Sequence, residues 1–151
     1  MRNLIICLFL SLISSPASAV VTGEMIMVRS SEAFPETMSL LQEAISNKGY
    51  TLVRVQRVDV GLTAKGYKTD KYRVVFFAKG EQLQQLSAQY PQLIPYLPLK
   101  IAIFAEDENT ILISANPTVF NDMFNIPALR PVLQTWQNDI TDILNTVQTA
   151  N

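Results

Sequence analysis

The sequence predicts a two-layer α+β sandwich, and three observations carry that prediction. Strand-like and helix-like segments follow one another in the order strand, helix, strand, strand, helix, strand, strand, helix. The first six have the ferredoxin-like βαββαβ order, to which a strand and a C-terminal amphipathic helix are added. The chain has 151 residues, 48% hydrophobic and 17% charged, which is the size and composition of one globular domain.

Side-chain periodicity predicts the first three elements. Residues 25–29 read as a short strand, and the serines at 30–31 are placed to cap a helix that has Pro35 in its first turn. Gly49 is placed to end that helix, and residues 51–60 alternate as a second strand. The apolar residues of the helix recur at three- and four-residue steps: Phe34, Met38, Leu41 and Ile45.

The middle of the chain predicts three more strands and a second helix. A strand over 72–78 is followed by a helix over 80–90, and the three prolines of 91–98 predict an irregular or extended segment. Strands over 100–105 and 110–115 are joined by the turn Glu106-Asp107-Glu108-Asn109.

A long amphipathic helix is predicted at the C-terminus. Asn125 is placed to cap it, and Pro127 and Pro131 fit near its start. Its apolar stripe consists of eight residues: Leu129, Val132, Leu133, Trp136, Ile140, Ile143, Leu144 and Val147.

Two of the predicted strands are apolar on both faces. These are residues 74–77 and 101–104, whereas a sheet with one face in water shows alternation. We therefore expect something to cover the second face of the sheet, either the terminal helix or a second copy of the protein.

The N-terminus has the pattern of a cleavable secretory signal peptide over residues 1–19. Arg2 precedes an apolar run over 4–13, and Ala17-Ser18-Ala19 is a small-x-small cleavage site. The run is too short to span a bilayer as a helix. We expect cleavage after Ala19, a periplasmic or secreted protein, a domain over 20–120, and a helical extension over 121–151 that packs on the domain or on a dimer partner.

The composition excludes several kinds of chemistry. The chain has no His, and the removal of residues 1–19 would take away its one Cys, so the usual catalytic triads and the usual zinc, haem and iron–sulfur ligands are missing. A net charge of −1 gives no electrostatic footprint for nucleic acid. No nucleotide-binding glycine motif occurs, and we expect no cofactor and no metal.

Several segments nevertheless admit a functional interpretation beside a structural one. Asp59 is either a lone base or a turn-forming residue. The basic loop around Tyr67 either holds an anionic ligand or is a solvated connection. The turn over 106–109 either binds a hard cation or only reverses the chain, and Met25 and Met27 either bind copper(I) or pack in the core.

Most of the chain resembles the domain-of-unknown-function 302 (DUF302) family. The resemblance covers about residues 24–120 and is carried by the segments Tyr72–Lys79, Tyr96–Ile101 with its Leu-Pro-Leu-Lys run, and Ala115-Asn116-Pro117. It implies a small two-layer α+β fold, a dimer and no known activity. Many members have Asp-His where this chain has Asp59-Val60, so any site that needs that His is absent here.

Six residues match or border these motifs or lie in the basic loop, and we take them as candidate binding residues: Asp59, Tyr67, Lys79, Tyr96, Lys100 and Asn116. We expect an exported, non-catalytic binding or interaction domain, a homodimer that binds a small molecule or another envelope protein. One alternative is an enzyme that uses Asp59 as base and Lys79 or Lys100 to stabilise an anion. Another is a structural envelope protein that docks through its C-terminal helix.

Overall fold

A six-stranded antiparallel sheet is the centre of the structure, a computed structural model that describes residues 18–150. The strands are β1 (Val20–Val21), β2 (Met25–Ser30), β3 (Thr51–Arg57), β4 (Tyr72–Ala78), β5 (Leu99–Glu106) and β6 (Asn109–Ala115). They lie in the order β1-β2-β6-β5-β4-β3. The predicted α+β class is confirmed, whereas residues 1–17 of the expected signal peptide lie outside the described residues.

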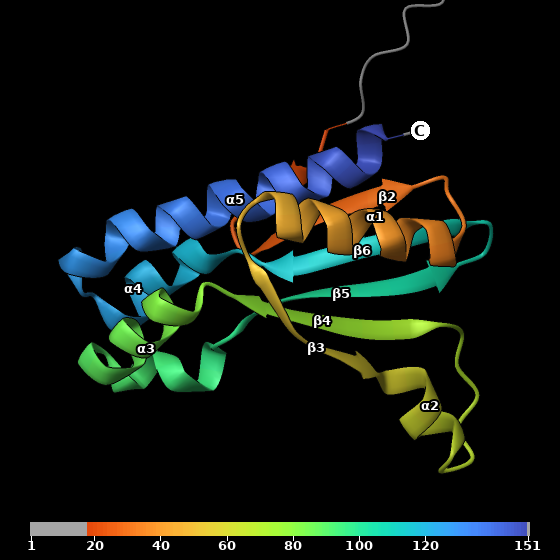
Figure 1. The fold of residues 1–151 in the computed structure, drawn as a ribbon, viewed down its shortest axis with the longest axis horizontal. Coiled ribbons are helices and arrows are strands. Elements are labelled where there is room, and N and C mark those ends of the chain that lie inside the picture. The colour runs from red at the N-terminus through yellow and green to blue at the C-terminus, as the bar shows by residue number, and fades with distance from the viewer. Residues whose placement is uncertain (1–17, 151) are drawn as a thin grey trace, which may run out of the picture.

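Helices α1 and α5 lie on one face of this sheet, α3 and α4 lie at one end of it, and α2 lies apart from these four, beyond the end of β3 (Figure 1). The α-helices are α1 (Phe34–Asn47), α2 (Val58–Thr63), α3 (Gly80–Gln89), α4 (Phe120–Phe124) and α5 (Arg130–Thr149). Three short 3₁₀ turns are η1 (Pro91–Tyr96), η2 (Pro117–Val119) and η3 (Pro127–Leu129). Helices α1 and α5 pack against each other and against the sheet, which makes the two layers.

The core lies between the sheet and this helix pair. Seven of the eight residues of the predicted C-terminal stripe are buried: Leu129, Leu133, Trp136, Ile140, Ile143, Leu144 and Val147. They meet Ile26 and Val28 of β2, Leu41 and Ile45 of α1, and Ile101 of β5 in one cluster. The terminal helix therefore lies on the same face as α1 and is not the cover of the second face.

The strand order differs from that of a ferredoxin-like sheet, in which the first strand of the βαββαβ unit separates the third from the fourth. Here β4 pairs directly with β5, and β2 pairs with β6. The reason is the place of α3, which packs against η1 beyond the end of the sheet instead of crossing its face. The chain consequently returns antiparallel beside the strand that it has just left.

Two predicted boundaries are wrong for local reasons. The strand predicted over 51–60 ends at Arg57, and residues 58–60 start α2, because the alternating valines of that segment are also compatible with a helical turn. Asn125 does not cap α5: it has a φ of 49° and ends α4. Gly49, in contrast, follows α1 with a φ of 78° as expected.

Candidate functional site

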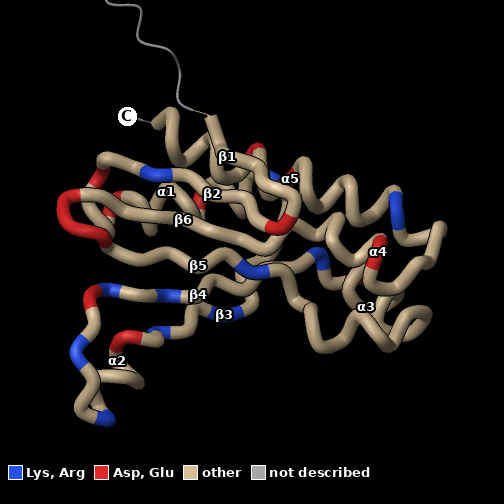
Figure 2. The backbone as a smooth tube through the Cα atoms, turned by 180° about the vertical axis from the view of Figure 1, so that it is seen from behind, with Lys and Arg blue, Asp and Glu red and all other residues tan. Residues whose placement is uncertain are grey.

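The sheet face opposite α1 and α5 has no helix over it, and we call it the uncovered face. Side chains alternate along each strand, and the ladder registers place one apolar set on this face. It consists of Val20, Met25, Met27, Tyr72, Val74, Phe76, Ala102, Phe104, Ile111, Ile113 and Ala115. Figure 2 views the molecule from this side. The strands are apolar on both faces although helices cover only one.

Two hollows lie side by side on the uncovered face and share Ile113. One, of about 510 Å³, lies between the chain at Thr69–Tyr72 and the side chains of Ala102 and Phe104. The other, of about 460 Å³, lies against Met25 and Met27 near β1. Met25 and Met27 are 43% and 39% exposed, so both contribute accessible apolar surface.

Charged residues mark the two ends of the strands on this face. Lys100 lies near the start of β5, beside Phe76 of β4. Glu106 ends β5 and forms an ion pair of 2.5 Å with Arg29 of β2. Acidic residues gather at the β5–β6 turn in Figure 2. The turn that the sequence offered as a cation site belongs to this acidic end, and the described residues contain no cluster of three or more acidic groups fit to hold a metal ion.

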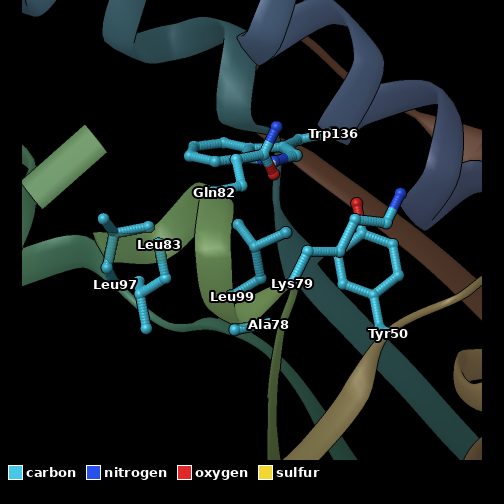
Figure 3. A pocket seen from close by; sticks show the side chains of 8 residues that line it. All are labelled: Tyr50, Ala78, Lys79, Gln82, Leu83, Leu97, Leu99 and Trp136. Atoms are coloured by element: carbon cyan, nitrogen blue, oxygen red, sulfur yellow. The ribbon is translucent and has the colours of Figure 1, made fainter. Parts of the chain in front are cut away.

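Lys79 lines a narrow cleft between β4, α3 and α5 (Figure 3). Its ammonium lies 4.3 Å from the centre of the Tyr50 ring, and the indole Nε1 of Trp136 donates a hydrogen bond of 3.0 Å to Gln82 Oε1. The free space in the cleft is about 10 Å³, which is room for about one water molecule. The cleft in this form does not accommodate an organic ligand.

Asp139 of α5 collects the polar groups behind this cleft. The Tyr50 hydroxyl donates to its Oδ2 at 2.7 Å, and the ammonium groups of Lys79 and Lys48 lie 3.4 and 3.7 Å from its carboxylate oxygens. Burial and the contact with Asp139 raise the pKa of Tyr50 well above its ordinary value. This network ties α5 to the segments that follow α1, precede β3 and follow β4.

Asp59 and Tyr67 lie on an arm formed by α2 and the following loop, which projects from the sheet (Figure 1). Asp59 forms an ion pair with Arg73 of β4, and the hydrogen bond from that guanidinium lowers the pKa of Asp59. The amide of Val60 also donates to Asp59 Oδ1 at 2.8 Å. Tyr67 is 63% exposed. Asp59 thus pins the arm to the sheet as a carboxylate.

Tyr96 and Asn116 have structural surroundings. The ring of Tyr96 contacts Phe120 in a tilted arrangement, with centroids 4.6 Å apart, and Phe124 edge-to-face, with centroids 5.8 Å apart, which attaches η1 to α4. Asn116 is buried and accepts hydrogen bonds from the amide and hydroxyl of Thr118. Its side-chain amide donates to the carbonyl of Gly23 at 3.3 Å. Asn116 therefore closes the turn after β6.

The structure does not bring the six candidate residues into one site. Lys100 lies on the uncovered face, Lys79 in the narrow cleft, Asp59 and Tyr67 on the arm, and Tyr96 and Asn116 in structural contacts. Sequence reasoning missed Asp139, because the groups around it come together only when α5 packs. It did detect the uncovered face, through the two strands that are apolar on both sides.

Within residues 18–150, no helix is both long enough and apolar enough to cross a bilayer. The sequence profile of the family "Domain of unknown function DUF302" matches residues 26–147, so the match runs through α5. No curated protein gives a significant match. The crystal structure of an uncharacterised conserved DUF302 protein from Bacillus stearothermophilus has a similar fold, with a TM-score of 0.76 at 19% identity over 83% of this chain and 99% of the other. The chain therefore belongs to the DUF302 family.

Proposed function

We propose that this chain is an exported, non-catalytic interaction domain and that the uncovered face is its contact surface. One observation supports the proposal: ten apolar side chains on five strands, all at least partly exposed, are grouped with the buried Ile111 where no helix covers them. Contiguous apolar patches of this kind mark interaction sites in soluble proteins. Export is supported by the signal pattern of residues 1–19, which would start the mature chain at Val20, the first residue of β1.

The placement of the charged candidates favours binding over catalysis. The carboxylate-dependent enzyme considered from the sequence would need Asp59 to meet Lys79 or Lys100 at one substrate. Asp59 is held by Arg73, and Lys79 follows Arg73 by six residues along β4, or roughly 20 Å. Docking through α5 is also less favoured, because its apolar stripe is buried inside this chain and would have to leave the sheet.

Native mass spectrometry of the mature protein, purified from the compartment to which it is exported, tests the proposal. We expect a second copy, a small molecule or another envelope protein to remain bound. Ala102→Asp places a charge in the centre of the uncovered face and should release the bound molecule. Met27→Asp, at a partly exposed position, provides a second variant with less risk to folding. Ala88→Asp on the exposed side of α3 is the control.

Circular dichroism would verify that each variant is folded. A wild-type protein that is a bare monomer would overturn the proposal. Association that survives both face variants would also overturn it, because the contact would then lie elsewhere.

A further inference from the structure

We propose that the uncovered face binds a second copy of this chain, through a two-fold axis that crosses the strands at the level of Ile103. This inference rests on the proposed function and names the partner of the same face. Three observations carry it: the size of the apolar area, the charges at its two ends, and the pairing of small with large side chains that only one symmetry gives.

The extent of the face favours a protein over a small molecule. The two-residue strand β1 and the strands β2, β4, β5 and β6, of six to eight residues each, outline a flat area of roughly 480 Å², and the relief of the side chains and the arm add to it. A standard interface buries about 800 Å² on each partner. The two hollows on the face would seat a small ligand over only part of this area, so such a ligand would leave most of the apolar side chains in water.

The strand registers arrange the face in rows of cross-strand neighbours. Lys100 and Phe76 are partners in one row. The next row contains Ala102, paired with Val74 on one side and Ile113 on the other. The row after that contains Phe104, paired with Tyr72 and Ile111, and Glu106 follows at the end of β5. Along β5 the face therefore presents a cation, a small residue, a large residue and an anion.

The charges at the ends of β5 are available for a partner. Lys100 is exposed and forms no ion pair with another residue in the described part of the chain. Glu106 has only the pair with Arg29, in which both side chains are about half exposed. A second copy would place its own Glu106 beside Lys100, and each Glu106 would then lie between Arg29 of its own chain and Lys100 of the other copy.

Symmetry then selects the orientation. Two sheets that stack face to face lie about 10 Å apart with their strands nearly aligned, so the two-fold axis runs between them, either along the strands or across them. An axis along the strands brings the two Lys100 side chains to the same end. An axis across the strands at Ile103 places Lys100 opposite Glu106 of the second copy, and Ala102 opposite Phe104. Small residues then face large ones, as interdigitated sandwich cores require.

Charge reversal with analytical ultracentrifugation tests this arrangement. Lys100→Glu alone and Glu106→Lys alone each create two like-charged contacts, and each should raise the dissociation constant of the dimer at least about tenfold. A mixture of the two variants restores both contacts and should form a heterodimer about as tightly as the wild type. Arg130→Glu at the start of α5 and Glu43→Lys on α1, both exposed and on the helical layer away from the face, are the charge-matched controls.

Zero-length carbodiimide coupling gives an independent readout on the wild-type protein. Within one chain Lys100 and Glu106 are about 20 Å apart along β5, so an amide between them can only join two copies. Peptide mass spectrometry of the covalent dimer should find this link.

Each outcome bears on a different proposal. A wild-type dimer with no 100–106 link, and with no rescue on mixing, overturns the arrangement. A monomer that retains another molecule, and loses it in Ala102→Asp, overturns the self-association but leaves the contact surface in place. A bare monomer overturns both proposals.

Discussion

Replacement of Tyr50 by Phe tests how the polar network of α5 stabilises the fold. Tyr50 is 4% exposed, packs edge-on against Phe77 at 5.2 Å, and donates its hydroxyl to Asp139 Oδ2 at 2.7 Å. Tyr50→Phe keeps the ring and removes only the donor. A hydrogen bond to a charged group contributes about 1.5–3 kcal/mol. We therefore expect the free energy of unfolding at pH 7 to fall by about 2 kcal/mol.

The same side chain predicts a pH dependence whose sign follows from its pKa. Burial, together with Asp139, raises the pKa of Tyr50 above its ordinary value of 10.0. Above pH 10 the unfolded chain therefore loses this proton while the native protein keeps it. Stability that is fully present below pH 10 is then lost as the pH rises, by about 1.4 kcal/mol between pH 9 and pH 11. Tyr50→Phe lacks this contribution, so its deficit should shrink to about 0.6 kcal/mol at pH 11.

Urea unfolding between pH 7 and pH 11, followed by the fluorescence of the single tryptophan, Trp136, measures both effects. The hydrogen bond to Asp142 raises the pKa of Lys48 as well; both proteins contain this pair, and Lys48→Met in both backgrounds removes its titration from the comparison. Tyr67→Phe, at an exposed position, should change stability by less than about 0.5 kcal/mol. A deficit that stays constant up to pH 11 would refute the reasoning.

Three further predictions concern stability and use the same urea assay. Asp59→Asn should reduce the loss of stability as the pH falls below about 4. The Arg73 guanidinium lowers the pKa of Asp59 below its ordinary 3.8, so the stability from this ion pair is present above that value and is lost as the carboxylate is protonated. If stability falls with acid equally in both proteins, the ion pair does not contribute. Phe77→Ala should cost about 3–5 kcal/mol, because the ring is fully buried; a loss below about 1 kcal/mol would mean that the core closes over the gap. Gly49→Ala should lower the free energy of unfolding by about 1 kcal/mol, because Gly49 has a φ of 78° and the nearest atom to an added Cβ is 4.0 Å away, so only the backbone conformation is strained. Gly23→Ala, with no neighbour within 4 Å and no positive φ, should be nearly neutral.

The elements that the sequence predicted well are those defined by local chemistry. The stripe from Leu129 to Val147 has one helical solution, and it forms α5. Gly49 ends α1 because a positive φ suits glycine best. The segment Tyr72–Ala78, apolar except for Arg73, forms a central strand with buried or half-buried side chains on both faces. In each case the residues themselves restrict the backbone.

The features that the sequence did not predict depend on contacts distant in the chain. Whether β4 pairs with β5 depends on where α3 lies, and nothing in residues 80–89 states that it packs on η1 at the end of the sheet. Asp139 becomes the centre of a network only when α5 reaches Tyr50, 89 positions earlier in the chain. The candidate residues are dispersed for the same reason: each lies beside a motif, but motifs that are close in a family pattern need not meet in space.

The helix inventory explains why one face is left without a cover. Six strands about 4.8 Å apart make a sheet roughly 24 Å wide, and two helices about 10 Å across cover nearly all of that width. Helices α1 and α5 lie together on one face, and they are the only described helices longer than ten residues. No comparable helix is left for the second face, yet Val74, Ala102 and Ile113 keep it apolar. A sheet that had only to remain soluble would have polar residues at these positions, so their apolar character is best explained by a partner that removes them from water.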